Sequence, residues 1–284
     1  MRTAECRRSG SDIMRALQSQ NVSRKNVVSS ISGDRNDYRK IQHLIEQIRV
    51  EKVYPLSILE GLQSGEIFVD DDEAPAVSLI WHYCGFANIL GEYKEKFIED
   101  MMIMMQNPLD GHSGRMALQT ENNHQLQDMI LNFPGVLKYE RYIFEFVGER
   151  NSIPSIKESR LEEINSCNYD LMKGRIIPSF SWENKKSFLE NGFGYCLIED
   201  GKMSACAFSS GVSEDYVDIG VETAEECRGK GYGRLVTSAM VNETLRRGKV
   251  PVWGCDTRNE ASKRLACSVG FEITGTHAWY KYET

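Results

Sequence analysis

The sequence contains no run of about 18 apolar residues, the length that a membrane-spanning helix requires. Its start, MRTAECRRSGSDIMRALQSQ, is basic but has no apolar segment, so it does not resemble a secretory signal. We therefore expect no membrane span, no membrane partner and a cytoplasmic location.

Paired or clustered cysteines are also missing. The eight cysteines form no C-x-x-C pair and stand beside no histidine cluster, which argues against a zinc site or a disulfide framework. Several lie inside apolar runs such as GYCLI and SACAF, where Cys behaves as a small core residue. Reduced cysteines are typical of the cytoplasm. We expect no metal cofactor.

The sequence also lacks an excess of basic residues. Lys and Arg number 34 against 41 Asp and Glu, which gives a net charge of −7. Nucleic-acid binding normally requires a basic face, so we expect no nucleic-acid partner. An acidic surface would instead suit a small cationic substrate.

The length of 284 residues is enough for two domains. Residues 1–37 are rich in Ser, Asn and Arg and predict a loose extension with a short helix at residues 12–18. From residue 38 onward, strand patterns alternate with helix patterns, which predicts an α/β fold with a mixed sheet. The polar segment GERNSIPS predicts a boundary between domains at 38–150 and 151–284. The shared strand–helix rhythm hints at an internal duplication.

Four segments give local predictions. VSLIWHYCGFANIL reads as strands with a bulge or bend at Gly85. SWENKKSFLENG predicts a helix with Ser181 as its N-cap and Gly192 as its stop. VPVWGCD predicts one strand, and AWYKYE predicts the last strand of the fold.

The stretch ECRGKGYGRL carries the strongest functional pattern. It follows an alternating strand, YVDIGVET, and precedes a long amphipathic helix pattern. Glycines at every second position free the backbone N–H groups, and the helix dipole adds positive potential, so a strand–glycine loop–helix unit predicts an anion site. Arg228, Lys230 and Arg234 add charge, which makes a pyrophosphate the natural ligand. A merely flexible turn is the alternative.

Two phosphate-binding motifs fail here. The Walker A loop needs Lys-Ser or Lys-Thr after the glycines, and neither is present. The dinucleotide fingerprint needs a third glycine where Val236 stands. The loop matches R-x-x-G-x-G instead, and Asn259, Ser262 and the VGF ending at Phe271 follow it.

In these motifs the sequence resembles the GCN5-related N-acetyltransferases (GNAT superfamily). Segments such as VYPLSILEGLQSGEIFVDDDEAP and PVWGCDTRNEAS are similar to the bacterial subfamily that includes zwittermicin A resistance acetyltransferases. The resemblance covers nearly everything from about residue 38. It implies an acyl-CoA N-acyltransferase (GNAT) fold in the C-terminal domain, preceded by a degenerate GNAT-like N-terminal lobe.

The resemblance also implies acetyl-CoA as the acyl donor. The strand ending at Thr223 would pair with the pantetheine arm, the loop amides would hold the pyrophosphate, and Asn259 would contact the pantetheine unless it is an ordinary helix cap. The implied cofactor-binding residues are Val221, Glu222, Thr223, Arg228, Gly229, Lys230, Gly231, Tyr232, Gly233, Arg234, Asn259 and Ser262.

Acetyl transfer to an amine requires a base. Glu222 is our first candidate and Asp218 the second, because both lie on the strand face opposite Val217 and Ile219. Glu222 could also be an exposed carboxylate or an anchor for the substrate amine. The family's usual acid, a Tyr seven positions after the Asn, is replaced by Ala266.

These observations predict an N-acetyltransferase that acetylates a primary amine of a small molecule, such as an antibiotic or a metabolite. A non-catalytic acyl-CoA sensor and a protein N-acetyltransferase are the alternatives. The sequence leaves open whether the chain forms a homodimer.

Overall fold

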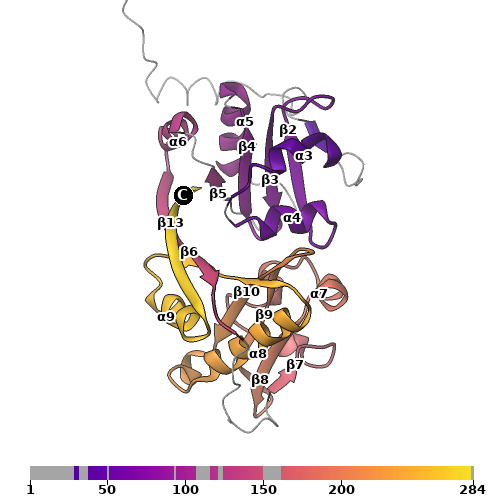
Figure 1. Ribbon diagram of the computed structural model, residues 1–284, viewed down its shortest axis with the longest axis vertical. Helices are drawn as coiled ribbons and strands as arrows, with labels where there is room; N and C mark the ends of the chain where they lie inside the picture. Colours follow the sequence, from indigo (N-terminus) through magenta and orange to yellow (C-terminus); the bar gives the residue numbers. More distant parts are fainter. Residues whose placement is uncertain are drawn as a thin grey trace, which may run out of the picture.

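The computed structural model describes residues 29–31, 38–49, 51–92, 94–106, 116–120, 124–149 and 161–282. Figure 1 shows two bodies stacked along the long axis of the molecule, each with its own strands and helices. Within the described ranges, no helix is both long and apolar enough to cross a membrane.

The upper body is built on an eight-stranded mixed sheet, called the large sheet here. Its strands, in spatial order, are β1 (Ser29–Ile31), β2 (Gly65–Val69), β3 (Val77–His82), β4 (Phe86–Gly91), β5 (Ala117–Thr120), β13 (Phe271–Tyr282), β6 (Val136–Phe146) and β12 (Gly254–Asp256). Neighbours pair antiparallel except for β4 and β5, which are parallel.

The lower body is built on a five-stranded sheet, called the small sheet. Its strands, in spatial order, are β11 (Val250–Val252), β10 (Tyr216–Thr223), β9 (Lys202–Val212), β8 (Gly194–Glu199) and β7 (Leu161–Glu163). Only the β10–β11 pair is parallel. The hairpin between β8 and β9 turns at Asp200 and Gly201, both with positive φ, as a tight hairpin requires.

The helices follow from apolar periodicity. They are α3 (Gln42–Ile45), α4 (Val53–Leu59), α5 (Glu95–Gln106), α6 (His124–Leu131), α7 (Lys185–Asn191), α8 (Tyr232–Arg246) and α9 (Glu260–Ser268), with 3₁₀ helices at Arg39–Ile41, Tyr169–Leu171, Pro178–Phe180 and Glu225–Cys227. The methionines of α5 pack with Leu79 and Trp81 of the large sheet, and Leu235 and Val236 of α8 pack with Ala205 and Ala207 of the small sheet.

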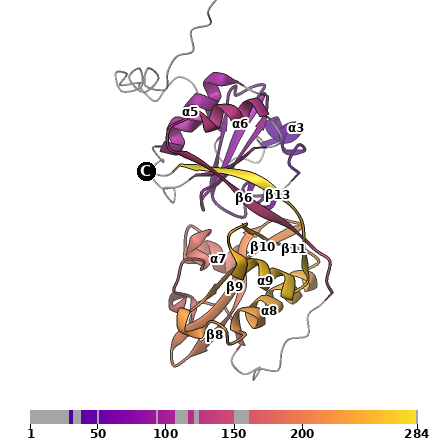
Figure 2. The same ribbon diagram turned by 90° about the vertical axis from the view of Figure 1, so that its left-hand side faces the viewer.

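The same order of elements occurs twice. Three antiparallel strands, a helix, a strand parallel to the third, a second helix and a final strand make β2-β3-β4-α5-β5-α6-β6, the first repeat. The second repeat is β8-β9-β10-α8-β11-α9-β13, with β12 as an extra strand before α9. The two repeats exchange their last strands, because β13 lies between β5 and β6 and β6 lies between β13 and β12. Figure 2 shows β6 and β13 running side by side between the bodies.

Three local predictions are wrong in detail. The N-cap of α7 is Asn184, not Ser181, because the Asn184 side chain accepts a bond from the Ser187 N–H and a 3₁₀ turn occupies the preceding residues. Gly85 does not bend a strand but lies in the turn between β3 and β4, with φ of 96°. VPVWGCD is two strands in different sheets, because the chain leaves β10 at the buried Trp253 and joins β6.

The last predicted strand is confirmed but is longer than AWYKYE, since β13 begins at Phe271. Of the predicted extension at residues 1–37, the structure describes strand β1, and the short helix predicted at residues 12–18 lies outside the described residues. Most of the predicted boundary segment at 148–155 also lies outside them. The alternation of strands and helices confirms the predicted mixed α/β class.

Candidate active site

A cavity of about 1270 Å³ lies where the two bodies meet, and residues of both line it. Its wall includes every sequence-predicted site residue except Lys230, which is exposed outside it. From the upper body the wall takes Tyr54, Phe86, Tyr139 and Arg141. The cavity is therefore a site shared between the repeats.

The glycine loop ends in an uncapped helix terminus. Gly229 and Gly231 have φ of 76° and 81°, in the left-handed region that favours glycine. Gly231 is the N-cap of α8 and offers no side-chain cap, and the first turn of the helix contains no acidic residue. A Cβ at Gly233 would lie 3.0 Å from Thr223 Oγ1, so the loop can approach β10 this closely only without a side chain. The N–H groups of this terminus are left for a ligand.

Strand β10 has an open edge beside the loop. It pairs with β11 only at Tyr216, Val217 and Asp218, so the edge from Ile219 to Thr223 has no strand partner among the described residues. On its other edge, β10 pairs with β9 from Val217 to Thr223, with a bulge at which Ser210 is skipped. An unpaired strand edge can accept an extended ligand as an added strand.

These features fit a CoA molecule on two independent grounds. The amides and positive dipole of α8 match a diphosphate, and Arg228 and Arg234 on the cavity wall add charge. The open edge of β10 matches the amide groups of a pantetheine arm. Within the described ranges, no group of three or more His, Cys, Asp or Glu side chains is arranged to hold a metal ion.

Asp218 lies at the β-bulge, where the open edge of β10 begins. Its carboxylate accepts a hydrogen bond of 2.6 Å from the Tyr54 hydroxyl, and Ser210 Oγ lies 3.0 Å from the same phenol oxygen. Withdrawal from water raises the pKa of Asp218 to about 7, because it outweighs the lowering effects of the Tyr54 bond and Arg141. A carboxyl group with this pKa can take up and release a proton near neutral pH.

Glu222, the first candidate base, is engaged elsewhere. Its Oε2 accepts backbone N–H bonds from Arg175 at 3.0 Å and Ile176 at 2.8 Å. A Cβ at Gly174 would lie 2.6 Å from Glu222 Cγ, so this loop packs directly on the side chain. The geometry makes Glu222 an anchor that fastens the loop at 174–176 to β10.

Asn259 and Ser262 also have internal partners. Asn259 is the N-cap of α9, and its side chain accepts a bond of 3.1 Å from the Ser262 N–H. The Ser262 hydroxyl accepts a bond of 3.1 Å from the Trp253 indole. Both residues line the cavity, so they shape its wall in addition to capping the helix.

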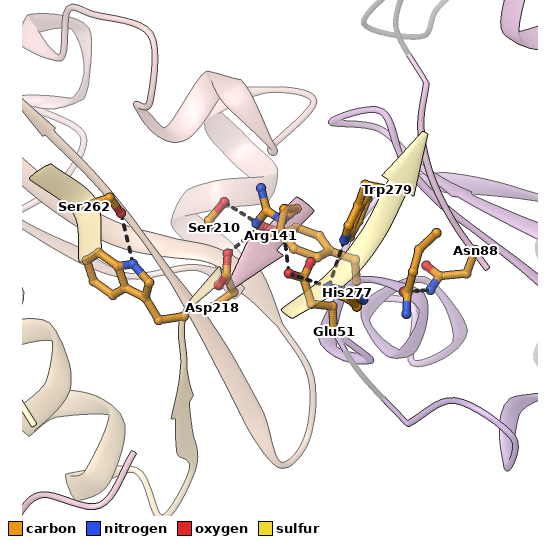
Figure 3. A network of polar contacts seen from close by, with 11 residues as sticks. Glu51, Asn88, Arg141, Ser210, Asp218, Ser262, His277 and Trp279 are labelled. Carbon is orange, nitrogen blue, oxygen red and sulfur yellow. Dashed lines mark hydrogen bonds and ion pairs between the residues drawn. The ribbon is translucent and has the colours of Figure 1, made fainter. Parts of the chain in front are cut away.

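A buried ion pair supports the wall opposite β10, which Arg141 lines while Glu51 lies behind it. Arg141 Nε donates to Glu51 Oε1 at 3.1 Å, and the two side chains are 14% and 9% exposed. Burial alone would raise the pKa of Glu51, but Arg141 and His277 lower it, so the carboxylate stays charged. Figure 3 shows Arg141 between Asp218 and the group formed by Glu51, His277 and Trp279.

The position of the usual acid contributes no proton donor. Ala266 is fully buried in the core beneath α8 and α9. Tyr280 is buried in the core of the upper body, whereas Tyr282 lines the cavity. The Tyr54 hydroxyl is the phenol that the structure brings to Asp218.

Sequence reasoning missed Tyr54, Glu51 and Arg141. Tyr54 contacts Asp218 across a separation of 164 residues, and in VYPLSIL it looks like part of an apolar helix face. Arg141 and Glu51 are separated by 90 residues. No local motif marks such partners.

A sequence profile described as GNAT acetyltransferase matches residues 42–280 of the chain. The Bacillus subtilis (strain 168) protein YdfB, named as an uncharacterized N-acetyltransferase, is 26% identical over 99 residues. That match covers 35% of this chain and 38% of YdfB, so it spans well under half of either protein.

Solved structures show the same architecture. A GCN5-related N-acetyltransferase-like protein from Streptococcus suis superposes with a TM-score of 0.70 at 21% identity, covering 88% of this chain and 100% of that one. A tandem GNAT protein from the clavulanic acid biosynthesis pathway superposes with a TM-score of 0.57 at 8% identity, covering 90% and 98%. At these identities the likeness concerns the fold.

Proposed function

Because the chain belongs to the GNAT acetyltransferase family, we propose that it transfers the acetyl group of acetyl-CoA to a primary amine of a small molecule. One observation carries this proposal: a base with a pKa near 7, Asp218, stands where the open edge of β10 begins, in the same cavity as the glycine loop. Donor site and base thus share one space.

Different residues of the chain bind the diphosphate and align the pantetheine arm of the donor. Acetyl-CoA, when bound, supplies an acetyl carbonyl activated as a thioester. The amides from Gly229 to Gly233 and the charges of Arg228 and Arg234 bind its diphosphate, and the edge from Ile219 to Thr223 aligns the pantetheine arm. Lys230 reaches the phosphates only from outside the cavity.

Asp218 is the proposed general base, and Glu222 takes a positioning role. Asp218 accepts a proton from the substrate ammonium, and Tyr54 and Ser210 hold the carboxylate in place. Glu222 keeps the loop at 174–176 against the cavity. A thiolate leaves readily because its basicity is low, so the alanine at position 266 is compatible with transfer.

The domains at 38–150 and 151–284 also remain our proposal, with the first as a GNAT-like lobe that walls the acceptor side. A cytoplasmic location fits the free cysteines of the described ranges. The zwittermicin-type subfamily remains a prediction.

The test is to incubate the purified protein with acetyl-CoA and a library of primary amines, and to follow thiol release and product mass. We expect at least one small amine to raise thiol release above hydrolysis and to gain an acetyl group. Tight CoA binding with no acetylated product would instead identify a sensor. Labelling of polypeptides alone would identify a protein acetyltransferase.

A further inference from the structure

The wall of the cavity that faces Asp218 is the face of β6 and β13 on which Arg141 lies. In the register of this pair, Arg141 is opposite His277 and Tyr139 is opposite Trp279, so alternate residues of both strands share that face. The cavity is lined there by Tyr139, Arg141 and Lys281. A substrate held against Asp218 therefore meets a cationic and aromatic surface.

Arg141 is held by an ion pair and two aromatic rings, while its terminal N–H groups remain available. Its guanidinium carbon lies 5.1 Å from the ring centre of Phe86 and 5.2 Å from that of Trp279, so two rings fix its plane. Only Nε is bonded, to Glu51. The structure records no hydrogen bond from the two terminal nitrogens of Arg141 to any described residue.

The neighbours of Arg141 place it on the side of the cavity where we propose that the acceptor binds. Asp218 and Arg141 interact electrostatically, and a Cβ at Gly254 would lie 2.9 Å from Arg141 Nη2. Gly254 stands two positions after Val252, the register partner of Asp218 on β11. Glu51 is not part of the cavity wall, so its role toward Arg141 is to hold it from behind.

From this arrangement we infer that the acceptor is an amino carboxylate, whose amine faces Asp218 and whose carboxylate is bound by the terminal nitrogens of Arg141. The planar fork of a guanidinium matches a carboxylate with two parallel hydrogen bonds. A second cation on the same strand pair, Lys281, also lines the cavity. Phe86, Met116 and Phe180 provide an apolar surface for the rest of the molecule.

This inference rests on the proposed function for the identification of the cavity as an acceptor site. It also adds to an expectation from composition: although the chain is acidic overall, the β6–β13 wall of the cavity carries Arg141 and Lys281, so an acceptor with a carboxylate has a partner there that a purely cationic acceptor could not use.

The test uses matched probes that differ only in the carboxylate. The CoA-loaded protein is titrated in a calorimeter with L-phenylalanine and L-phenylalaninamide, and with 4-aminobutyrate and 4-aminobutyramide. We expect the acid of at least one pair to bind about tenfold or more tightly than its amide, as a charge-assisted bidentate contact implies.

Variants separate recognition from a structural clamp. Arg141→Met should reduce the acid-to-amide ratio to about one, and Arg141→Lys should leave an intermediate ratio because it keeps the charge but not the fork. Glu51→Gln leaves the guanidinium in the cavity and should keep the ratio, whereas a mere ion-pair clamp would make Glu51→Gln and Arg141→Met alike. Arg246→Met, at the surface end of α8, is the matched control.

Because Arg141→Met leaves Glu51 as a buried unpaired charge, the double variant Glu51→Gln/Arg141→Met is measured beside it. The inference is overturned if the wild type binds the acid of neither pair more tightly than the matching amide. Separate assays with acetyl-CoA and the same four amines, followed by thiol release, keep the two proposals distinct. Acids that bind without acetylation would contradict the transferase, and amides acetylated as fast as acids would contradict only the carboxylate site.

Discussion

The two repeats use one order of elements, yet they differ where the third strand meets the following helix. In the first repeat, β4 pairs with β5 from Phe86 to Ile89 and ends shortly after, at Gly91. In the second, β10 continues from Ile219 to Thr223 beyond its last pair with β11. One repeat closes the parallel pair, and the other leaves an edge open.

The helix that follows differs in the same sense. Helix α5 begins with Glu95 in its first turn, and Lys94 at its start pairs with Asp70. Helix α8 begins directly after Gly229 and Gly231 and has no acid in its first turn. Between β4 and β5, the Asn88 amide donates to Gln119, so side chains bridge these strands. The comparison teaches that the strand edge and helix start filled by protein contacts in the first repeat are left open in the second, where we propose the ligand site.

The largest effect should come from removing the proposed base, Asp218, which has no acidic counterpart in β4 of the first repeat. Asp218→Asn keeps the size of the side chain but cannot accept the ammonium proton, so we expect kcat/KM to fall about 10²- to 10⁴-fold. Because the carboxylate is the active form and its pKa is about 7, the wild-type rate should rise with pH through 7 and then level off. Steady-state kinetics from about pH 5.5 to 9 measures the loss of kcat/KM and the rise of the wild-type rate with pH.

A wild-type profile that is flat across neutrality, or an Asp218→Asn variant that keeps the same limb, would assign the base elsewhere. Glu222→Gln is the comparison variant, because its role as a loop anchor predicts a change in KM more than in this limb.

The next largest effect is expected from a variant that makes the start of α8 resemble the start of α5. Gly231→Glu places a side chain at φ of 81° and a negative charge at the start of α8, as Glu95 does in α5. We expect CoA affinity in calorimetry to fall by about 100-fold or more, since strain and charge repulsion both oppose diphosphate binding.

Gly248→Glu is the matched control, because Gly248 has φ of 74° at the other end of α8 and open space for a Cβ. Gly248→Glu should destabilise the fold about as much as Gly231→Glu does, but it should bind CoA with the affinity of the wild type. Equal CoA binding by Gly231→Glu and the wild type would remove the glycine loop from the donor site.

A core change in the first repeat should affect stability alone. Met102 is fully buried between α5 and the large sheet, so Met102→Ala should lower the free energy of unfolding by about 2–5 kcal/mol in urea titrations. The Kd for CoA of the folded protein should not change. Met104→Ala, which is only partly buried, should cost less, and a CoA affinity that falls in both variants would show that this core supports the donor site.

The smallest effects compare two buried tyrosines. Tyr280 has a buried hydroxyl with no hydrogen-bond partner among the described residues, so Tyr280→Phe should be neutral or stabilise by about 1 kcal/mol. Tyr54→Phe loses the bond to Asp218 and should destabilise by about 1–3 kcal/mol.

Tyr54→Phe has a second consequence, in the pH profile. The Tyr54 bond lowers the pKa of Asp218, so its loss should move the rising limb to higher pH. A limb that moves down, or equal stability changes for the two variants, would contradict the hydrogen-bond assignment. Thermal unfolding and the kinetic profile together check it.

Local patterns in the sequence predicted the parts of the site that are local. The glycine loop, β10 and α8 follow one another in the chain, so spacing and periodicity were sufficient to place them. The strand VPVWGCD was predicted as one piece, because nothing in its composition shows that Trp253 would be buried and divide it between two sheets. Tertiary packing overrides strand propensity at such points.

The acceptor side of the site could not be read in this way. Tyr54 and Arg141 reach the cavity only because the bodies meet there, and their partners are distant in sequence. Glu222 and Asp218 share a strand face, so the pattern could not tell the loop anchor from the base that we propose. That distinction comes from the bulge at Ser210 and from the amides of Arg175 and Ile176.

The exchange of last strands sets a condition on how the protein is made. Strand β5, which pairs with β4, obtains its second neighbour only when β13 has been synthesised, so the first repeat leaves the ribosome with one native sheet edge unpaired. The native partner of that edge is absent until the second repeat has been translated. An unpaired strand edge of this kind can pair with other chains, so the interval before β13 emerges is the one in which mispairing is favoured.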